Sequence, residues 1–188
     1  MGGVVALTVL AALSASWLAS RSYFSGADAR VPVIALAPVA ASALIGVCLG
    51  SKDVELERST PHPWPARRTT EVLAWTVLTS AGLAATVAAD PTVFGSMAMV
   101  RNVIGYIGLA CLTTTVLGAA LSWLPGFLIS GTLYLAAPRP PTGLAKLWAW
   151  PMTPGEFDTS WITPLLLFLA GLTLYAHLGP RSIPAEDT

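Results

Sequence analysis

The residues that could take part in chemistry are few and scattered. Two cysteines, Cys48 and Cys111, lie inside long apolar runs, and two histidines, His62 and His177, stand alone. A zinc or iron site needs several such side chains converging at short spacings, and the sequence contains no HExxH, HxxxH or CxxC pattern. We therefore expect buried thiols and no metal site.

Motifs for nucleotide binding and nucleophilic catalysis are missing as well. The sequence has neither a GxxxxGK[ST] loop for phosphates nor a GxSxG nucleophile motif. We expect that the chain is not an enzyme and that any ATP-driven step takes place on another subunit. A membrane-embedded lipid enzyme is a weaker alternative, because its candidate residues share no recognisable spacing: Asp90, Glu156, Asp158 and His62.

The composition identifies the solvent. Of the 188 residues, 54% are hydrophobic and only 11% are charged, whereas a soluble domain carries roughly 25% charged residues. The outer surface is therefore expected to face lipid. The ten basic and ten acidic residues cancel, and without an excess positive charge we expect no nucleic acid partner.

Apolar windows of membrane length divide the chain. Six of them have no Asp, Glu, Lys or Arg in their interiors: 3–20, 31–50, 71–89, 102–121, 122–137 and 161–178. A charge at the bilayer centre costs roughly 2.5 to 3.5 kcal/mol, so these windows fit hydrocarbon. They predict an all-α, polytopic integral membrane protein with about six transmembrane helices in one domain, residues 1–188.

Two of these windows need comment. No Lys or Arg precedes the first window, so we expect a retained helix rather than a cleaved signal peptide. The fourth and fifth windows are continuous and must turn near residues 123–126, where Pro125 and Gly126 favour a turn.

The segment between the second and third windows, residues 51–70, holds the densest charge in the chain. We call it the elbow and expect it to lie in water. Its polar residues 53–59 could form a short helix, which Pro61, Pro63 and Pro65 would stop before an extended return to the membrane.

The segment 138–160 is aromatic and broken by prolines, so we expect it to lie in the membrane interface or to re-enter the membrane, and we call it the interfacial segment. Tryptophan prefers the headgroup layer, so Trp148, Trp150 and Trp161 are expected to be interfacial anchors. Arg101 and Asn102 open the fourth window, where they could contact lipid headgroups or a polar substrate group.

Helix packing and orientation are less strongly determined. Glycines spaced three or four residues apart, Gly46 with Gly50 and Gly105 with Gly108, indicate generic close packing of helices. Basic residues divide five against five between the two sides of the membrane, so the positive-inside rule gives a tie. We favour a cytoplasmic N-terminus because four basic residues crowd the elbow.

The order of these parts resembles the membrane subunit of an ABC-2-type exporter: six spans, a charged elbow after the second, and a broken aromatic segment before the sixth. Several stretches are similar to small actinobacterial membrane proteins associated with ATPases of ABC transporters: PVIALAPVAASALIG, ELERSTP with an Arg pair, RNVIGYIGLACL, SWLPG, WAWPMTPG and YAHLGPR. The likeness covers most of the chain.

The resemblance implies the permease subunit of a bacterial ABC-type exporter in the cytoplasmic membrane, moving a hydrophobic or amphipathic compound by alternating access. Its partners would be a second membrane subunit, of the same or another sequence, and ATPase subunits that carry ATP and Mg²⁺. Glu55, Glu57 and Arg58 would then lie on the coupling helix that docks into the ATPase, where their charges set the register.

Two alternatives remain open at this stage. The charged elbow could be a solvated loop that only holds the topology. The whole chain could also be a scaffold or immunity-type membrane protein that binds another membrane protein and transports nothing, since small-residue faces and short loops suit that role equally well.

Overall fold

The structure, a computed structural model, describes residues 31–50, 63–87, 95–136 and 141–181. Within these ranges every regular element is helical, with six α-helices and three short 3₁₀ helices. The predicted all-α class is confirmed for this part of the chain. The first expected span, 3–20, and the elbow residues Glu55, Glu57 and Arg58 lie outside the described residues.

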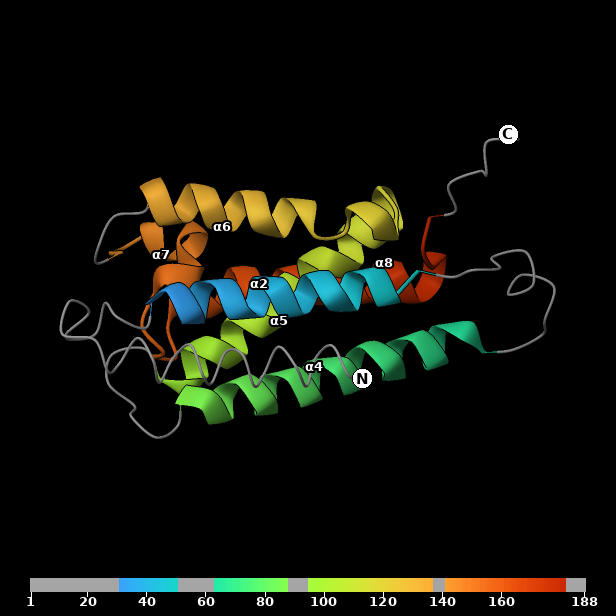
Figure 1. Cartoon of the computed structure of the whole chain (residues 1–188), viewed down its shortest axis with the longest axis horizontal. Coiled ribbons are helices and arrows are strands. Elements are labelled where there is room, and N and C mark those ends of the chain that lie inside the picture. The colour runs from blue at the N-terminus through green and yellow to red at the C-terminus, as the bar shows by residue number, and fades with distance from the viewer. Residues whose placement is uncertain (1–30, 51–62, 88–94, 137–140, 182–188) are drawn as a thin grey trace.

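Five of the α-helices run along the long axis of the molecule, and α7 lies at one end (Figure 1). The α-helices are α2 (Val31–Cys48), α4 (Trp64–Val87), α5 (Ser96–Val116), α6 (Leu124–Ala136), α7 (Ala145–Trp148) and α8 (Ile162–Leu178). The 3₁₀ helices are η3 (Ala119–Leu121), η4 (Trp150–Met152) and η5 (Thr159–Trp161).

Three helical stretches are long and apolar enough to cross a membrane: Trp64–Val87, Ser96–Val116 and Thr159–Leu178. At 1.5 Å per residue, the shortest of them extends about 30 Å, which matches the hydrocarbon core of a bilayer. Two further apolar helices, Ala35–Cys48 and Ala119–Leu133, are shorter. Length and composition therefore indicate a membrane protein, while the full count of six spans stays a prediction.

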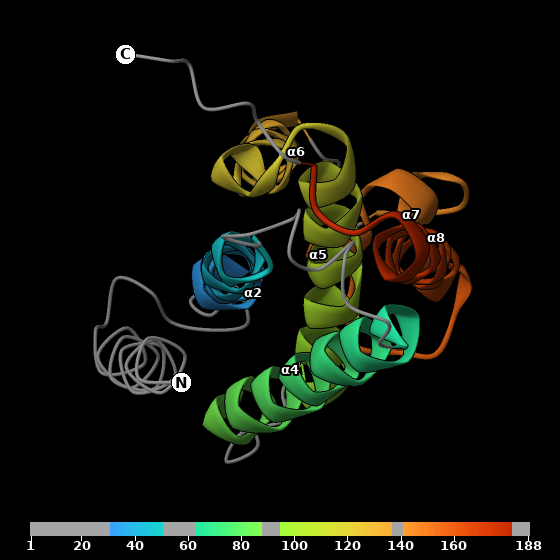
Figure 2. The same ribbon diagram turned by 90° about the vertical axis from the view of Figure 1, so that its right-hand side faces the viewer.

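The centre of the bundle is α5, with α2, α4, α6 and α8 around it (Figure 2). In its apolar window 72% of the residues are buried, against 33% in the windows of α4 and α8. The buried face of α5 carries apolar side chains such as Val103 and Ile107 together with polar ones such as Thr114. The central helix, which carries the buried Arg101, is thus kept away from lipid by its neighbours.

Helices α5 and α8 cross in close contact at two glycines. A Cβ atom on Gly108 would lie 2.4 Å from the Phe168 Cα, and one on Gly171 would lie 2.2 Å from the Gly108 carbonyl oxygen. Neither position has room for a side chain. The predicted use of glycine for close helix packing is borne out at Gly108, whereas the missing Cβ of Gly105 leaves space for the Trp150 ring.

The successive helices alternate in direction, so the molecule has two distinct ends (Figure 1). We call the end that holds the C-terminus of α2, the N-terminus of α4 and the C-terminus of α8 the elbow end. The opposite end, which we call the loop end, holds the first turns of α5 and α8 and the interfacial segment from residue 141 onward.

The elbow is shorter than the sequence predicted. Residues 64–70 are the first two turns of α4 rather than an extended return to the membrane. Pro65 does not stop a helix here because it lies in the first turn, where the backbone N–H that proline lacks has no helical acceptor anyway.

Two other boundaries also differ from the prediction. The turn between α5 and α6 occupies residues 117–123 and contains η3, and Pro125 lies in the first turn of α6 instead of in the turn. The helix α5 begins at Ser96, so Arg101 lies in its second turn. Of the two cysteines, Cys111 is buried as expected, whereas Cys48 is exposed at the end of α2.

Candidate functional site

The Arg101 side chain is the most unusual feature of the loop end. It is a charged group with no exposed surface, 0%, and its side chain reaches from α5 into the interfacial segment. Nη1 donates to the Pro154 carbonyl oxygen at 2.9 Å and to Ser160 Oγ at 2.8 Å, and Nη2 donates to the Thr153 carbonyl oxygen at 2.7 Å. Nε and Nη2 each donate to Asn102 Oδ1 at 3.4 Å. These bonds use all five N–H groups of the guanidinium.

Asn102 is also completely buried, and its Nδ2 donates to the Pro151 carbonyl oxygen at 3.1 Å. Two adjacent residues of α5 therefore bind three carbonyl groups of the interfacial segment. The prolines of that segment prevent a regular helix, which would otherwise satisfy those carbonyls. The Arg101–Asn102 pair replaces the missing helical donors, and it explains how irregular backbone can lie against the bundle.

Trp150 packs against α5 one helical turn beyond Arg101 and Asn102. Its side chain is only 3% exposed, and its ring lies 4.9 Å from the Tyr106 ring, centroid to centroid, at a tilt of 50°. A Cβ on Gly105 would come within 2.6 Å of the indole. The Tyr106 hydroxyl in turn shares a hydrogen bond with Ser130 of α6. The expected role of Trp150 as an interfacial anchor is therefore replaced by a core contact.

The other two predicted anchors differ from each other. Trp148 is 49% exposed, in keeping with a headgroup position. Trp161 is buried, donates its indole N–H to the Glu156 carbonyl oxygen at 3.1 Å, and stacks on Phe157 with the ring centroids 4.6 Å apart. Its polar atom is thus satisfied by the chain itself.

Asp158 supplies a partly buried negative charge in this region. Its carboxylate accepts from Ser160 N at 3.0 Å and Ser160 Oγ at 2.5 Å, and it pairs with Lys146 Nζ at 2.5 Å. Partial burial alone raises the pKa of Asp158, but the hydrogen bonds from Lys146 and Ser160 and the charge of Lys146 outweigh it and lower the pKa to about 2. Through Ser160 the carboxylate is connected to Arg101, whose positive charge it partly offsets.

The loop end therefore works as a structural clamp. The donors of Arg101 all reach acceptors within the chain, and neither Arg101 nor Asn102 has exposed surface. The sequence predicts a contact of these two residues with headgroups or substrate, whereas in the structure the proline-broken segment takes up their hydrogen-bonding capacity. The sequence predicts both residues near the start of a helix, but it could not reveal hydrogen-bond acceptors some 50 positions away.

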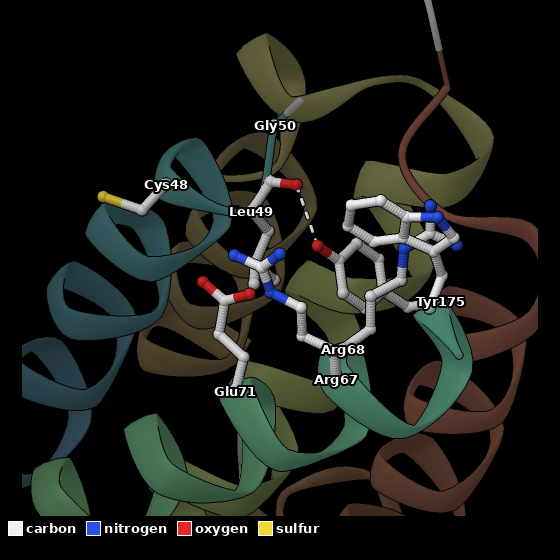
Figure 3. A pocket seen from close by; sticks show the side chains of 8 residues that line it. Cys48, Leu49, Gly50, Arg67, Arg68, Glu71 and Tyr175 are labelled. Carbon is white, nitrogen blue, oxygen red and sulfur yellow. Dashed lines mark hydrogen bonds between the residues drawn. The ribbon is translucent and has the colours of Figure 1, made fainter. Parts of the chain in front are cut away.

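The elbow end contains a second polar cluster, where three helix ends meet (Figure 3). The Tyr175 hydroxyl of α8 donates to the Leu49 carbonyl oxygen at 2.9 Å, just after α2. Arg68 Nη1 of α4 donates to the Ala176 carbonyl oxygen of α8 at 3.4 Å. Gly179, with φ +75°, follows α8 and lies so close to Arg68 that a Cβ would come within 2.6 Å of its guanidinium carbon.

Between these contacts lies an open pocket of about 110 Å³. Its lining comes from all three helix ends, in order Cys48, Leu49, Gly50, Trp64, Arg67, Arg68, Glu71 and Tyr175. The two arginine guanidinium carbons lie 5.4 and 6.0 Å from the centroid of the Trp64 ring, for Arg67 and Arg68 respectively. Within the described residues, no group of three or more His, Cys, Asp or Glu side chains could hold a metal ion.

No protein family, curated protein or solved structure matches this chain. The function therefore has to be inferred from the two clusters themselves. The loop end is closed by its own hydrogen bonds, whereas the elbow end has open space, charge and the attachment points of the elbow.

Sequence reasoning singled out the elbow but missed the groups that hold it. The sequence predicts an extended backbone at Trp64 and an interfacial or core position for Tyr175, but it does not predict the contacts of either residue. A tyrosine in the last turn of an apolar helix, followed by glycine, was the available signal, because a phenolic hydroxyl near a helix end normally finds a backbone acceptor.

Proposed function

We propose that this chain is the transmembrane subunit of a bacterial ABC-type exporter of the cytoplasmic membrane, with the elbow end in the cytoplasm. A partner ATPase would supply ATP hydrolysis, and a second membrane subunit would complete the path of a hydrophobic or amphipathic compound. The chain itself would perform no chemistry; it would convert movement of the elbow into movement of its helices.

The observation that carries this proposal is that both ends of the elbow are bonded to α8. The Tyr175–Leu49 hydrogen bond holds the residue where α2 enters the elbow, and the Arg68–Ala176 hydrogen bond holds the first turns of α4, where the elbow ends. A force on the elbow would therefore reach α8 from both sides. Since α8 packs backbone to backbone against α5 at Gly108, it could not move without shifting the central helix.

The distribution of charge supports a cytoplasmic elbow end. In the described residues Arg67, Arg68 and Arg181 lie at the elbow end, whereas Lys146 at the loop end is paired with Asp158. With a cytoplasmic N-terminus, Arg101 is one of the five basic residues expected on the outer side, but it is buried in protein and bonded to backbone. Without Arg101, more basic residues lie on the elbow side than on the outer side. The positive-inside rule then favours a cytoplasmic elbow end.

A second candidate, the scaffold or immunity-type membrane protein, has its own support at the loop end. An interior filled by side chains, with Arg101 and Asn102 committed to the chain's own carbonyls, suits a protein that presents a fixed surface to another membrane protein. This candidate requires a membrane partner but no ATPase.

The two candidates are separated by the proteins that accompany the chain. Affinity purification from the native membrane in a mild detergent, followed by mass spectrometry, should recover a nucleotide-binding subunit with the wild-type chain and much less of it with Glu57→Lys. Glu156→Lys, a change of an exposed residue at the loop end, is the matched control and should leave recovery unchanged. Recovery of only another membrane protein, equally with both variants, would refute the exporter and favour the scaffold.

A further inference from the structure

We propose that the pocket at the elbow end binds the phosphodiester headgroup of an anionic membrane phospholipid. The inference needs only that the chain lies in a membrane, and it is independent of export. Three helix ends build the pocket, which places charged groups at the depth where the apolar helices leave the bilayer.

The size of the pocket limits its ligand. At about 110 Å³ it is small for a ligand pocket. Pockets for drug-sized molecules are several times larger, roughly 300 to 1,000 Å³. The space therefore suits a compact polar group such as a phosphate and leaves the remainder of a larger ligand outside.

The charge of the lining favours an anion. Arg67 and Arg68 face one carboxylate, Glu71, so the three side chains together carry one net positive charge. Guanidinium groups bind phosphate oxygens through paired N–H donors. Arg68 is held at its position by the Ala176 carbonyl, while Arg67 is exposed and its guanidinium lies over Trp64. Glu71 could accept hydrogen bonds from the hydroxyl groups of a glycerol headgroup.

The surroundings favour a lipid over a free phosphate ion. Tryptophans such as Trp64 prefer the headgroup layer. Exposed apolar side chains continue from the pocket residues on the same three helices, with Val47 56%, Leu73 42% and Leu178 67% exposed. Acyl chains attached to a headgroup in the pocket would lie along this surface, which a free ion would leave uncovered. Basic pockets between transmembrane helices are known sites for anionic lipid headgroups.

The test uses the full chain purified in detergent and titrated with phosphatidylglycerol or phosphatidylcholine, with bound lipid counted by native mass spectrometry. Wild type should retain phosphatidylglycerol in preference to phosphatidylcholine. Arg67→Gln should weaken phosphatidylglycerol binding about fivefold, the effect of one arginine that lies close to an anionic headgroup. Arg181→Gln removes an arginine at the same end but outside the pocket, so binding should not change.

A change of opposite sign makes the test stricter. Glu71→Gln removes the only carboxylate among the described residues that line the pocket and should strengthen phosphatidylglycerol binding severalfold, with the helix content by circular dichroism unchanged. Equal effects of Arg67→Gln and Arg181→Gln, or no gain with Glu71→Gln, would overturn the proposal. Full displacement of the lipid by excess inorganic phosphate would also overturn it, because it would identify an ion site.

Discussion

The Tyr175 hydroxyl donates a hydrogen bond of 2.9 Å to the Leu49 carbonyl oxygen, across 126 positions of sequence. Tyr175 is buried in the last turns of α8, and Leu49 is buried directly after α2. This bond thus joins the start of the elbow to α8, which is the helix that packs most extensively on the central α5.

Tyr175→Phe should loosen the end of α2 without disturbing the remainder of the bundle. Loss of one hydrogen bond costs about 0.5 to 1.5 kcal/mol, and we expect faster amide hydrogen exchange over residues 45–50 in particular. Tyr106→Phe, which removes the bond to Ser130, is the matched control and should affect α6 instead. The same exchange pattern in both variants would contradict the proposed junction.

Arg101→Lys should destabilise the protein despite keeping the positive charge. A lysine has one nitrogen and cannot reach Thr153, Pro154 and Ser160 together, so at least one buried carbonyl loses its donor. Each such loss costs about 1 to 3 kcal/mol. Thermal unfolding in detergent measures the effect, with Arg181→Lys as control. An equal, small shift in both variants would show that the clamp does not stabilise the fold.

The Asp158 carboxylate should make the stability depend on pH in the acid range. Its pKa in the folded protein is about 2, below the value of about 3.9 for an unperturbed aspartate. The lowered pKa stabilises the folded state fully above about pH 4, and this contribution is lost as the pH falls towards 2. The difference in melting temperature between wild type and Asp158→Asn should therefore shrink over that interval. A constant difference would mean that Asp158 does not titrate as described.

Gly171→Ala should be much more harmful than the same change at Gly131. The added methyl group would lie 2.2 Å from the Gly108 carbonyl oxygen, whereas at Gly131 no atom of another element lies within 4 Å. Overpacking of this kind costs about 1 to 3 kcal/mol, and more when the neighbour is backbone. The melting temperatures of the two variants provide the comparison. A similar decrease for both would contradict the close crossing of α5 and α8.

The helices were the part of this fold that sequence could predict. In lipid a long charge-free run can form little other than a helix. The helices α2 and α8 therefore lie close to their expected bounds. Boundaries set by proline were less accurate, because Pro65 and Pro125 start helices here instead of ending them. A proline in isolation carries no sign of which of the two roles it has.

The arrangement of side chains at both ends could not be predicted. Arg101 at a membrane boundary has the same local sequence whether it reaches to headgroups or to a folded segment, and its acceptors Thr153 and Pro154 are fixed only by the tertiary structure. Trp150 illustrates the same limit, since its burial depends on Gly105 in a different helix. The elbow residues Glu55, Glu57 and Arg58 lie outside the described residues, and their role stays a prediction.

The central claim is that the elbow meets an ATP-hydrolysing subunit, and cross-linking from the elbow tests it most directly. A photoreactive amino acid at position 57, introduced into the full chain in its native membrane, should give one dominant adduct with a nucleotide-binding protein. The same probe at exposed Phe157 of the loop end should give none. Adducts from position 57 to lipid or to another membrane protein alone would contradict the exporter assignment.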